Sequence, residues 1–209
     1  MKRLVVVGAG GFAREVAWLA REIGEYFIVG HVVSDRTKLG PRDSTVLGDL
    51  LWLDSNPSSF DALALGIGTP AARLKVASEL ANRHPAACWP ALIHPSVTFD
   101  AESTRFGPGC VVCAGVVATV NVEIESFAVV NLCCSNVHES RVGRGSVVNP
   151  GVNISGGVTI GEGVLIGTGA QVLQYLEVHN EATVGAGAVV TRNVGPRTTV
   201  VGVPARPLA

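Results

Sequence analysis

The segment 131–140, NLCCSNVHES, gathers the side chains in this chain that are best able to do chemistry. Cys133 and Cys134 are adjacent, and His138 is followed directly by Glu139. A thiol nucleophile needs a base or cation nearby to lower its pKa, whereas a metal site needs ligands at a particular spacing. A histidine beside a carboxylate can act instead as a general base near neutral pH. The segment alone leaves these choices open, so the elements around it must decide.

The second half of the chain has a strict six-residue period. Aliphatic residues recur at every sixth position: Val142, Val148, Ile154, Ile160, Ile166, Val172, Val178, Val184 and Val190. The phase extends back to Phe106, with Asn136 as its one polar member. This period fits neither a helix nor a hairpin and is typical of a parallel β-helix, in which three hexads form one coil. We expect about five coils, without a long excursion loop.

Placed in this phase, Cys134 occupies a slot held by small residues in later hexads, so we interpret it as a small buried hydrophobe. Cys133 has no local base or cation, and the two cysteines with His138 lack the spacing of a zinc site. We therefore expect neither a covalent thiol intermediate nor a bound metal. His138 and Glu139 follow the inward Asn136 around a corner of the coil, where they can face a ligand.

The first half has the pattern of an α/β domain. The pattern predicts a strand ending in a glycine turn at 3–11, a helix at 12–24, strands at 26–35 and 61–68, a helix at 70–83 and a fourth short strand at 87–93. This order predicts a small Rossmann-like parallel sheet. We place the domain boundary at 92, giving a small Rossmann-like domain at 1–92 and a β-helix at 93–209.

Composition narrows the class of partner. The chain of 209 residues is 47% hydrophobic but only 5% aromatic, contains 25 glycines and has a formal net charge of −1. This charge gives no electrostatic reason to expect binding to nucleic acid or to a membrane. The five cysteines have no disulfide-framework spacing, so we expect a reduced, cytoplasmic protein.

The glycine turn GAGGFARE follows the first strand and suggests a phosphate site at a helix start. The full G-x-G-x-x-G pattern is not met, and the domain is about half the length of a full dinucleotide domain. The glycines either hold phosphates or only turn the chain. An NAD-dependent oxidoreductase would need a longer sheet.

Five motifs together resemble one family, the sialic acid O-acetyltransferase and nucleotide-sugar N-acetyltransferase group of left-handed β-helix acyltransferases. They are VVVGAGGFAREV, IHPSV, NLCCSNVHESRVG, ISGGVTIGEGVLIGTGAQV and VVGVPARPL, in the order that the family has them. Bacillosamine-pathway acetyltransferases are similar. The resemblance implies a left-handed coil, a homotrimer, acetyl-CoA as co-substrate, and an active site between neighbouring subunits.

The resemblance also assigns residues. It makes His138 the general base and Glu139 its helper, and it places the acetyl-CoA contacts at Val147, Thr168 and Ala186. The nucleotide-sugar contacts that it implies are Gly10, Gly11, Phe12, Asp35 and Gly68. Two positions depart from the family: Phe12 stands where many relatives have histidine, and Val147 stands where relatives often have a second histidine near the thioester. The identity of the acyl group therefore stays open.

We expect an acetyltransferase that acts on the amine of a nucleotide-linked amino sugar. O-acetylation of a sugar such as sialic acid would use the same base, and the sequence hardly separates the two reactions. A non-catalytic β-helix scaffold is the alternative from another class. His179 matches no motif of the family and is interpreted as a surface residue.

Overall fold

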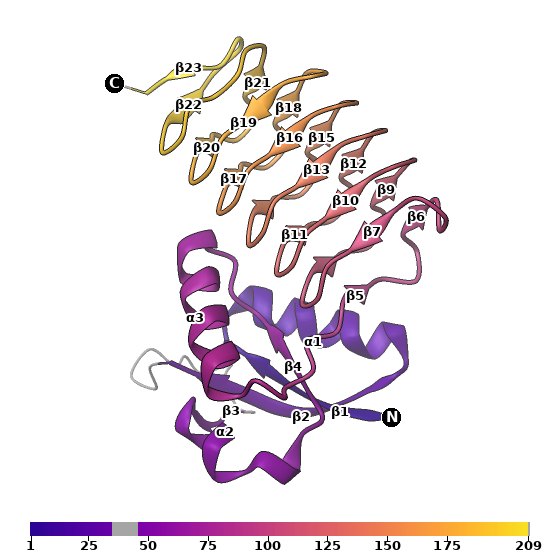
Figure 1. The fold of residues 1–209 in the computed structure, drawn as a ribbon, viewed down its shortest axis with the longest axis vertical. Helices are drawn as coiled ribbons and strands as arrows, with labels where there is room; N and C mark the ends of the chain where they lie inside the picture. The colour runs from indigo at the N-terminus through magenta and orange to yellow at the C-terminus, as the bar shows by residue number, and fades with distance from the viewer. Residues whose placement is uncertain (35–45, 209) are drawn as a thin grey trace.

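A computed structural model describes residues 1–34 and 46–208, in which a small α/β domain carries a β-helix (Figure 1). Asp35, expected at the sugar site, lies outside the described residues. The N-terminal sheet is parallel, in the order β3-β2-β1-β4. Its strands are β1 (Lys2–Val7), β2 (Tyr26–Val33), β3 (Val46–Asp49) and β4 (Ala62–Leu65). The helical elements are α1 (Gly11–Ile23), α2 (Leu51–Ser55), α3 (Pro70–Arg83) and the short 3₁₀ helix η2 (Pro57–Ser59).

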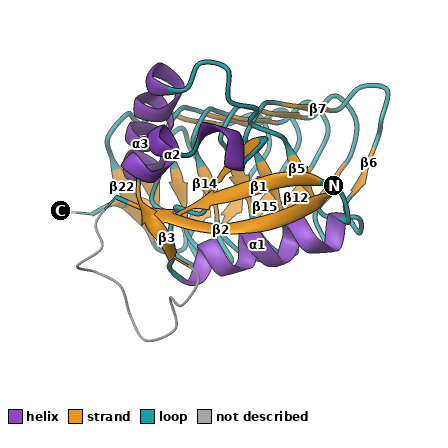
Figure 2. Ribbon diagram, turned by 90° about the horizontal axis from the view of Figure 1, so that it is seen from below, coloured by secondary structure: helices purple, strands orange, loops and turns teal. Residues whose placement is uncertain are grey.

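Helices cover both faces of this sheet, as its apolar strands require. α1 packs on the face that includes Leu4 and Val6, and α3 packs on the face that includes Val5 and Val7. Figure 2 shows α1 on one side of the strands, with α2 and α3 on the other. The α/β expectation is confirmed, with one correction: residues 87–93 do not form a strand of this sheet. Cys88 makes a single bridge to Ala62, and the following strand joins the β-helix instead.

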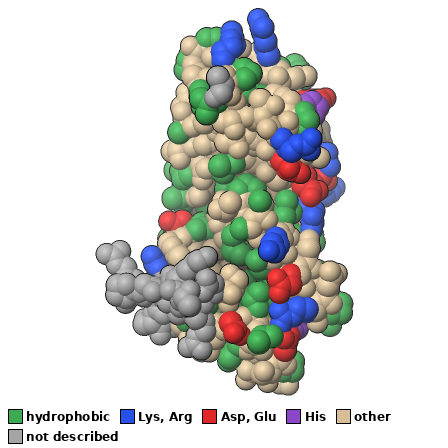
Figure 3. All heavy atoms as spheres, turned by 90° about the vertical axis from the view of Figure 1, so that its left-hand side faces the viewer, with side chains coloured by type: hydrophobic (Ala, Val, Ile, Leu, Met, Phe, Trp, Pro, Cys, Tyr) green, Lys and Arg blue, Asp and Glu red, His purple; other side chains and the backbone are tan. Residues whose placement is uncertain are grey.

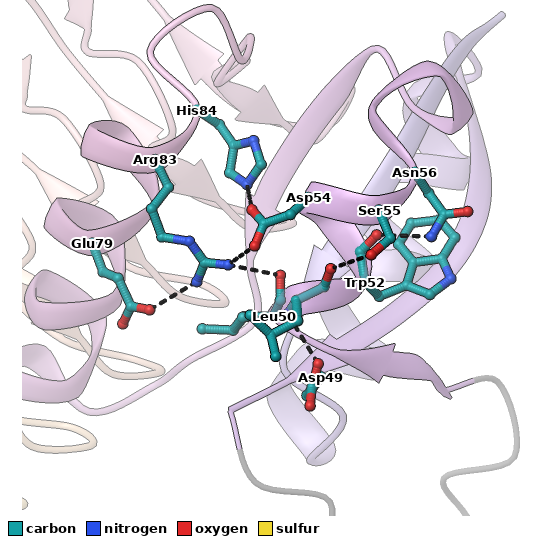
Figure 4. Close-up of polar contacts among 10 residues, drawn as sticks. Asp49, Leu50, Trp52, Asp54, Ser55, Asn56, Glu79, Arg83 and His84 are labelled. Atoms are coloured by element: carbon teal, nitrogen blue, oxygen red, sulfur yellow. Dashed lines mark hydrogen bonds and ion pairs between the residues drawn. The ribbon is translucent and has the colours of Figure 1, made fainter.

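α2 is held against the end of α3 by a cluster of polar side chains (Figure 4). Arg83 forms ion pairs with Asp54 and, at 3.0 Å, with Glu79, and it also contacts the carbonyl of Leu50. His84 Nε2 lies 2.9 Å from Asp54 Oδ1. Such partly exposed ion pairs stabilise a fold by only about 0–1 kcal/mol each. Their contribution here is to fix where α2 sits beside β3.

The β-helix has three sheets, named here I, II and III. Sheet I contains β5 (Leu92–Ile93), β8 (Val111–Val112), β11 (Val129–Val130), β14 (Val147–Val148), β17 (Leu165–Ile166), β20 (Thr183–Val184), β22 (Thr199–Val201) and the antiparallel β23 (Arg206–Pro207). Sheet II contains β6 (Thr98–Phe99), β9 (Val117–Ala118), β12 (Ser135–Asn136), β15 (Asn153–Ile154), β18 (Gln171–Val172) and β21 (Val189–Val190). Sheet III contains β7 (Arg105–Phe106), β10 (Glu123–Ile124), β13 (Arg141–Val142), β16 (Thr159–Ile160) and β19 (Glu177–Val178).

The pairing register confirms the hexapeptide repeat. Paired strands lie 18 residues apart from β7 to β21, as in the pairing of Glu123 with Arg141. Before β7 the spacing is 19, as between Thr98 and Val117, and after β21 it is 16, as between Thr183 and Thr199. The described coils therefore contain no excursion loop within the strict repeat, and the register shifts only at its two ends.

The inward-facing aliphatic side chains form one continuous core along the β-helix. Asn136 belongs to the column that also contains Ala118 and Ile154, and it is fully buried. Neither its side-chain nitrogen nor its side-chain oxygen has a hydrogen-bond partner among the described residues. The polar exception seen in the sequence therefore lies inside the core.

Sheet III and the turns that follow its strands present charged side chains to solvent. Arg141 Nε lies 3.5 Å from Glu123 Oε2, and Arg144 Nη1 lies 3.4 Å from Glu162 Oε1. Figure 3 shows basic and acidic side chains grouped along one margin of the β-helix. Because the two signs are interspersed, this face has no single-sign field that would attract a charged ligand.

Arg73 links the two domains by hydrogen bonds. Its side chain is fully buried, and it donates hydrogen bonds to the carbonyls of Phe127, Leu65, Ile67 and Gly109. Burial lowers the pKa of Arg73 to about 9, so the guanidinium remains charged at neutral pH. A charged donor fork shared between α3, the end of β4 and the first coils fixes the α/β domain against sheet I.

Candidate functional site

His138 lies on the edge of the β-helix between sheets II and III, in the turn that joins β12 to β13. The backbone of this turn is fixed by two bonds to neighbouring coils: Glu139 N–H donates to the carbonyl of Val120 at 3.0 Å, and Gly157 N–H donates to the carbonyl of His138 at 2.9 Å. The His138 side chain is 46% exposed. A rigid turn therefore presents a histidine that a ligand can reach.

Glu139 faces the histidine across a gap. Its Oε2 lies 3.9 Å from His138 Nδ1, longer than a hydrogen bond, and its side chain is 62% exposed. Glu139 also has a φ of 60°, in the left-handed region that favours glycine. The structure places the two predicted residues side by side, without a direct hydrogen bond between the carboxylate and the imidazole.

Thr168 and Ala186 lie together on a second edge, between sheets I and II. They are one coil apart, both are exposed, and Gly187 N–H donates to the carbonyl of Thr168 at 2.9 Å. Val147 does not share this surface. It begins β14 on sheet I, is only 2% exposed, and belongs to a buried apolar cluster that also contains Val16 of α1, so the expected contact with the thioester stays a prediction.

The glycine turn brings most of the expected sugar-nucleotide residues together. Gly10 caps the N-terminus of α1, no acidic residue follows in its first turn, and a side chain at Gly10 would meet nothing within 4 Å. Gly68, after β4, lies against the Phe12 ring, because a Cβ there would come within 3.9 Å of Phe12 Cδ1. An open helix N-terminus of this kind can receive an anionic group such as a phosphate.

Two tight contacts shape this turn. Gly8 has a φ of 120°, and a Cβ on it would lie 2.7 Å from the carbonyl oxygen of Gly66. His31 on β2 is buried, and its Nδ1 lies 2.8 Å from the carbonyl oxygen of Gly8. His31 is not predictable from the sequence, because a histidine within an apolar strand gives no signal until the pairing of β1 with β2 places it beside Gly8.

Cys133 and Cys134 have different environments in the structure. Cys134 is buried, its Sγ lies 3.1 Å from the carbonyl oxygen of Asn149, and burial raises the pKa of its thiol to about 11. This confirms its interpretation as a small core residue. Cys133 is exposed and adopts a φ of 55° at the turn.

No helix among the described residues is both long enough and apolar enough to cross a membrane.

Comparison with known proteins gives consistent results. Residues 3–80 match the PglD N-terminal domain family. The acetyltransferase domain of PglB from Neisseria gonorrhoeae FA1090 is 32% identical, with complete coverage of both chains and a TM-score of 0.89. It has also been solved in complex with acetyl coenzyme A. No curated protein matches the sequence.

Two further solved structures share the whole architecture. A single-residue variant of perosamine N-acetyltransferase from Caulobacter crescentus, in complex with CoA and GDP-perosamine, is 30% identical, covers 100% of this chain and 98% of its own, and has a TM-score of 0.91. WeeI from Acinetobacter baumannii AYE is 28% identical over the full length of both chains, with a TM-score of 0.86. The chain is therefore an acyltransferase and belongs to the family of left-handed β-helix sugar acetyltransferases that includes the PglB acetyltransferase domain and perosamine N-acetyltransferase.

Proposed function

We propose that this chain transfers an acetyl group from acetyl-CoA to the amine of a nucleotide-linked amino sugar, with His138 as the general base. The observation that carries the proposal is the half-exposed His138 beside Glu139 on a fixed turn of the β-helix. Full-length relatives solved with acetyl coenzyme A, or with CoA and GDP-perosamine, support the two classes of ligand.

The proposed reaction needs one general base. The amine attacks the thioester carbonyl, the new C–N bond forms as the nitrogen loses its proton, and the C–S bond breaks to release CoA. Because Glu139 lies on the Nδ1 side of His138, Nε2 is the nitrogen that accepts the proton. The carboxylate stabilises the imidazolium by charge across 3.9 Å, and the released thiolate is protonated as CoA leaves.

The two ligands occupy different parts of the chain in this proposal. The turn at Gly10, Gly11 and Phe12, with Gly68 beside it, binds the nucleotide-sugar phosphates, with Asp35 as a further contact predicted from the sequence. Exposed backbone and side chains along the edge at Thr168 and Ala186 bind acetyl-CoA. Because this edge and the His138 edge differ, we propose a homotrimer in which neighbouring subunits complete each site. The cytoplasmic location stays a prediction.

The test compares two histidines in similar settings. His138→Ala should lower kcat by about 10²–10⁴, as loss of a general base does, while calorimetry with acetyl-CoA shows retained binding. His179 is a matched control, because it is also 46% exposed on a turn and lies 3.5 Å from the carboxylate of Glu177. His179→Ala should keep wild-type turnover. Near-normal turnover in His138→Ala would remove the proposed base.

The substrate is tested by a panel of nucleotide sugars with acetyl-CoA, in which release of free thiol reports turnover. Amino sugars should be acetylated, and their hydroxyl counterparts should not. Preference for the hydroxyl sugars would show that the reaction is O-acetylation, with the same base. No turnover with any acceptor would favour a β-helix that binds ligands without catalysis.

A further inference from the structure

The imidazole of His138 lies directly against Gly156, one coil further along the same edge. A Cβ built on Gly156 would lie 2.2 Å from Cε1, 2.3 Å from Nε2 and 2.8 Å from Nδ1 of His138. Carbon and nitrogen atoms that are not bonded approach to about 3.5–4.0 Å at their optimal separation. The end of the ring that carries both nitrogens therefore occupies the space of the missing side chain.

Backbone conformation does not require glycine at this position. Gly156 has no positive φ, unlike its neighbour Gly157 at 66°. The equivalent slots one coil earlier than His138 and one coil later than Gly156 carry the side chains of Val120 and Gln174. The fold thus accepts side chains in this slot, and the ring of His138 is what requires their absence at Gly156.

Gly157 is packed in the same way, but by a ring from the following coil. A Cβ on Gly157 would lie 2.4 Å from Cδ1 of Tyr175, which belongs to the following coil. The pair Gly156–Gly157 thus receives a ring from each neighbouring coil, the imidazole from one side and the phenol from the other. Tyr175 is 70% exposed, so this part of the edge remains open to solvent in the single chain.

We propose that Gly156 is a positioning residue for the acyl transfer: because it lacks a side chain, it leaves the space in which the imidazole of His138 is held. The inference rests on the proposed role of His138 as the base. A methyl group at Gly156 would displace the reactive end of the ring by about 1 Å, a misplacement that typically costs about 10² in rate. Because His138 is half exposed, its ring can swing toward solvent, and the coil itself need not unfold.

Gly156→Ala is the first test. It should lower kcat by about 10–100-fold, while KM for acetyl-CoA and for the acceptor sugar stays within about twofold, because neither ligand is assigned to this residue. The melting temperature should fall only slightly. Gly195→Ala is the matched control: Gly195 also has no positive φ, and its Cβ would meet only Thr198 Oγ1, at 3.3 Å. This variant should keep wild-type kcat.

A double-mutant cycle separates positioning from general damage. In the His138→Ala background the ring is gone, so adding Gly156→Ala should change the residual rate by less than about twofold. An additional loss equal to that in the wild-type background would show that Gly156 acts through something other than His138. The NMR resonances of the His138 ring should shift in Gly156→Ala and stay in place in Gly195→Ala.

The outcomes distinguish this inference from the function on which it rests. If His138→Ala keeps normal turnover, the proposed base is wrong. If His138→Ala loses turnover but Gly156→Ala keeps both the wild-type rate and the wild-type ring resonances, His138 remains the proposed base. The positioning role of Gly156 is then wrong.

Discussion

His138 and Thr168 lie on different edges of the β-helix, with sheet II between them. The proposed base and the expected acetyl-CoA surface therefore do not face each other within one chain. A second copy that places its Thr168 edge beside the His138 edge of the first would bring them together. The separation of these two residues is the structural reason for proposing a shared site.

Mixing two inactive variants tests the shared site. His138→Ala lacks the base, and Thr168→Trp obstructs the cofactor edge, so each variant alone should be nearly inactive. In a randomly mixed cyclic trimer, about a quarter of the sites would pair an intact His138 with an intact Thr168, so activity should return to about that fraction. Activity that stays at the level of the separate variants, in trimers shown to be mixed by mass spectrometry, would contradict a site between subunits.

Variants of the glycine turn should affect one substrate only. Gly11→Val puts a branched side chain at the start of α1, and His31→Leu removes the contact with the Gly8 carbonyl. Both should raise KM for the nucleotide sugar, by about tenfold or more for Gly11→Val. KM for acetyl-CoA should stay near wild type, because that ligand is assigned to the other domain. Equal weakening of both substrates would show that the assignment is wrong.

Periodicity made most of the fold predictable. A six-residue repeat fixes strand, turn and inward position together, so the β-helix follows from residues such as Val142 and Ile160 without any knowledge of distant contacts. The strands and helices around β1 and α1 were predictable for a similar local reason. β3 and α2 were not predicted, and the segment after Pro85 was wrongly added to the sheet. Whether a segment forms an edge element depends on the neighbour with which it pairs, and the local sequence does not show that neighbour.

Only those parts of the site that lie within one sequence motif were predictable. His138 and Glu139 stand next to each other in the sequence, so their proximity was certain. The contacts of Gly156 with His138 and of His31 with Gly8 join residues 18 and 23 positions apart, and only the coil pitch and the strand register bring them together. Val147 is a different case, since it is buried in a cluster that also contains residues of α1, and its contact with the cofactor stays a prediction.

Chemical modification should separate the cysteines into two classes. Burial raises the pKa of the Cys110 and Cys113 thiols to about 12 and that of Cys134 to about 11, whereas Cys88 and Cys133 are exposed. Thiolates are the reactive form, so iodoacetamide at pH 8 should label only Cys88 and Cys133 in the native protein. Peptide mass spectrometry reads the sites. Rapid labelling of Cys134 would show that the coil opens at this point.

Replacing both turn cysteines should leave the chemistry intact. The double variant Cys133→Ser and Cys134→Ser should retain kcat within a few-fold, because the sequence offers no local base or cation for either thiol and Cys134 is buried. A search for an acyl-enzyme by intact mass should find none after acetyl-CoA is added without acceptor. A loss of kcat as large as that in His138→Ala would revive a thiol nucleophile.

Asn136→Val should stabilise the protein. The buried amide has no partner for its nitrogen or oxygen within the described part of the chain, and an unpaired buried polar group costs about 1–3 kcal/mol. Valine restores the aliphatic character of a column whose next member is Ile154. Urea unfolding should therefore show a free energy of unfolding higher by about 1–2 kcal/mol. Ile154→Asn is the converse control and should lower it. A lower stability in Asn136→Val would mean that an ordered water satisfies the amide.

Glu139→Gly should gain stability and lose activity. Glu139 has a φ of 60°, and the equivalent turn positions at Gly145, Gly151 and Gly157 hold glycine at 65–70°. The left-handed conformation costs a residue with a side chain about 1–2 kcal/mol, so glycine should raise the free energy of unfolding by up to about that amount. The same change removes the carboxylate beside His138, which should lower kcat by less than the loss in His138→Ala.

Glu139→Gln separates the two effects, because it keeps the backbone strain and removes only the charge. Its stability should match wild type, and its kcat should fall as in Glu139→Gly. If neither variant changes kcat, the carboxylate 3.9 Å from Nδ1 does not assist the base. If Glu139→Gly is less stable than wild type, the glutamate has a structural role on this edge that outweighs its unfavourable backbone conformation.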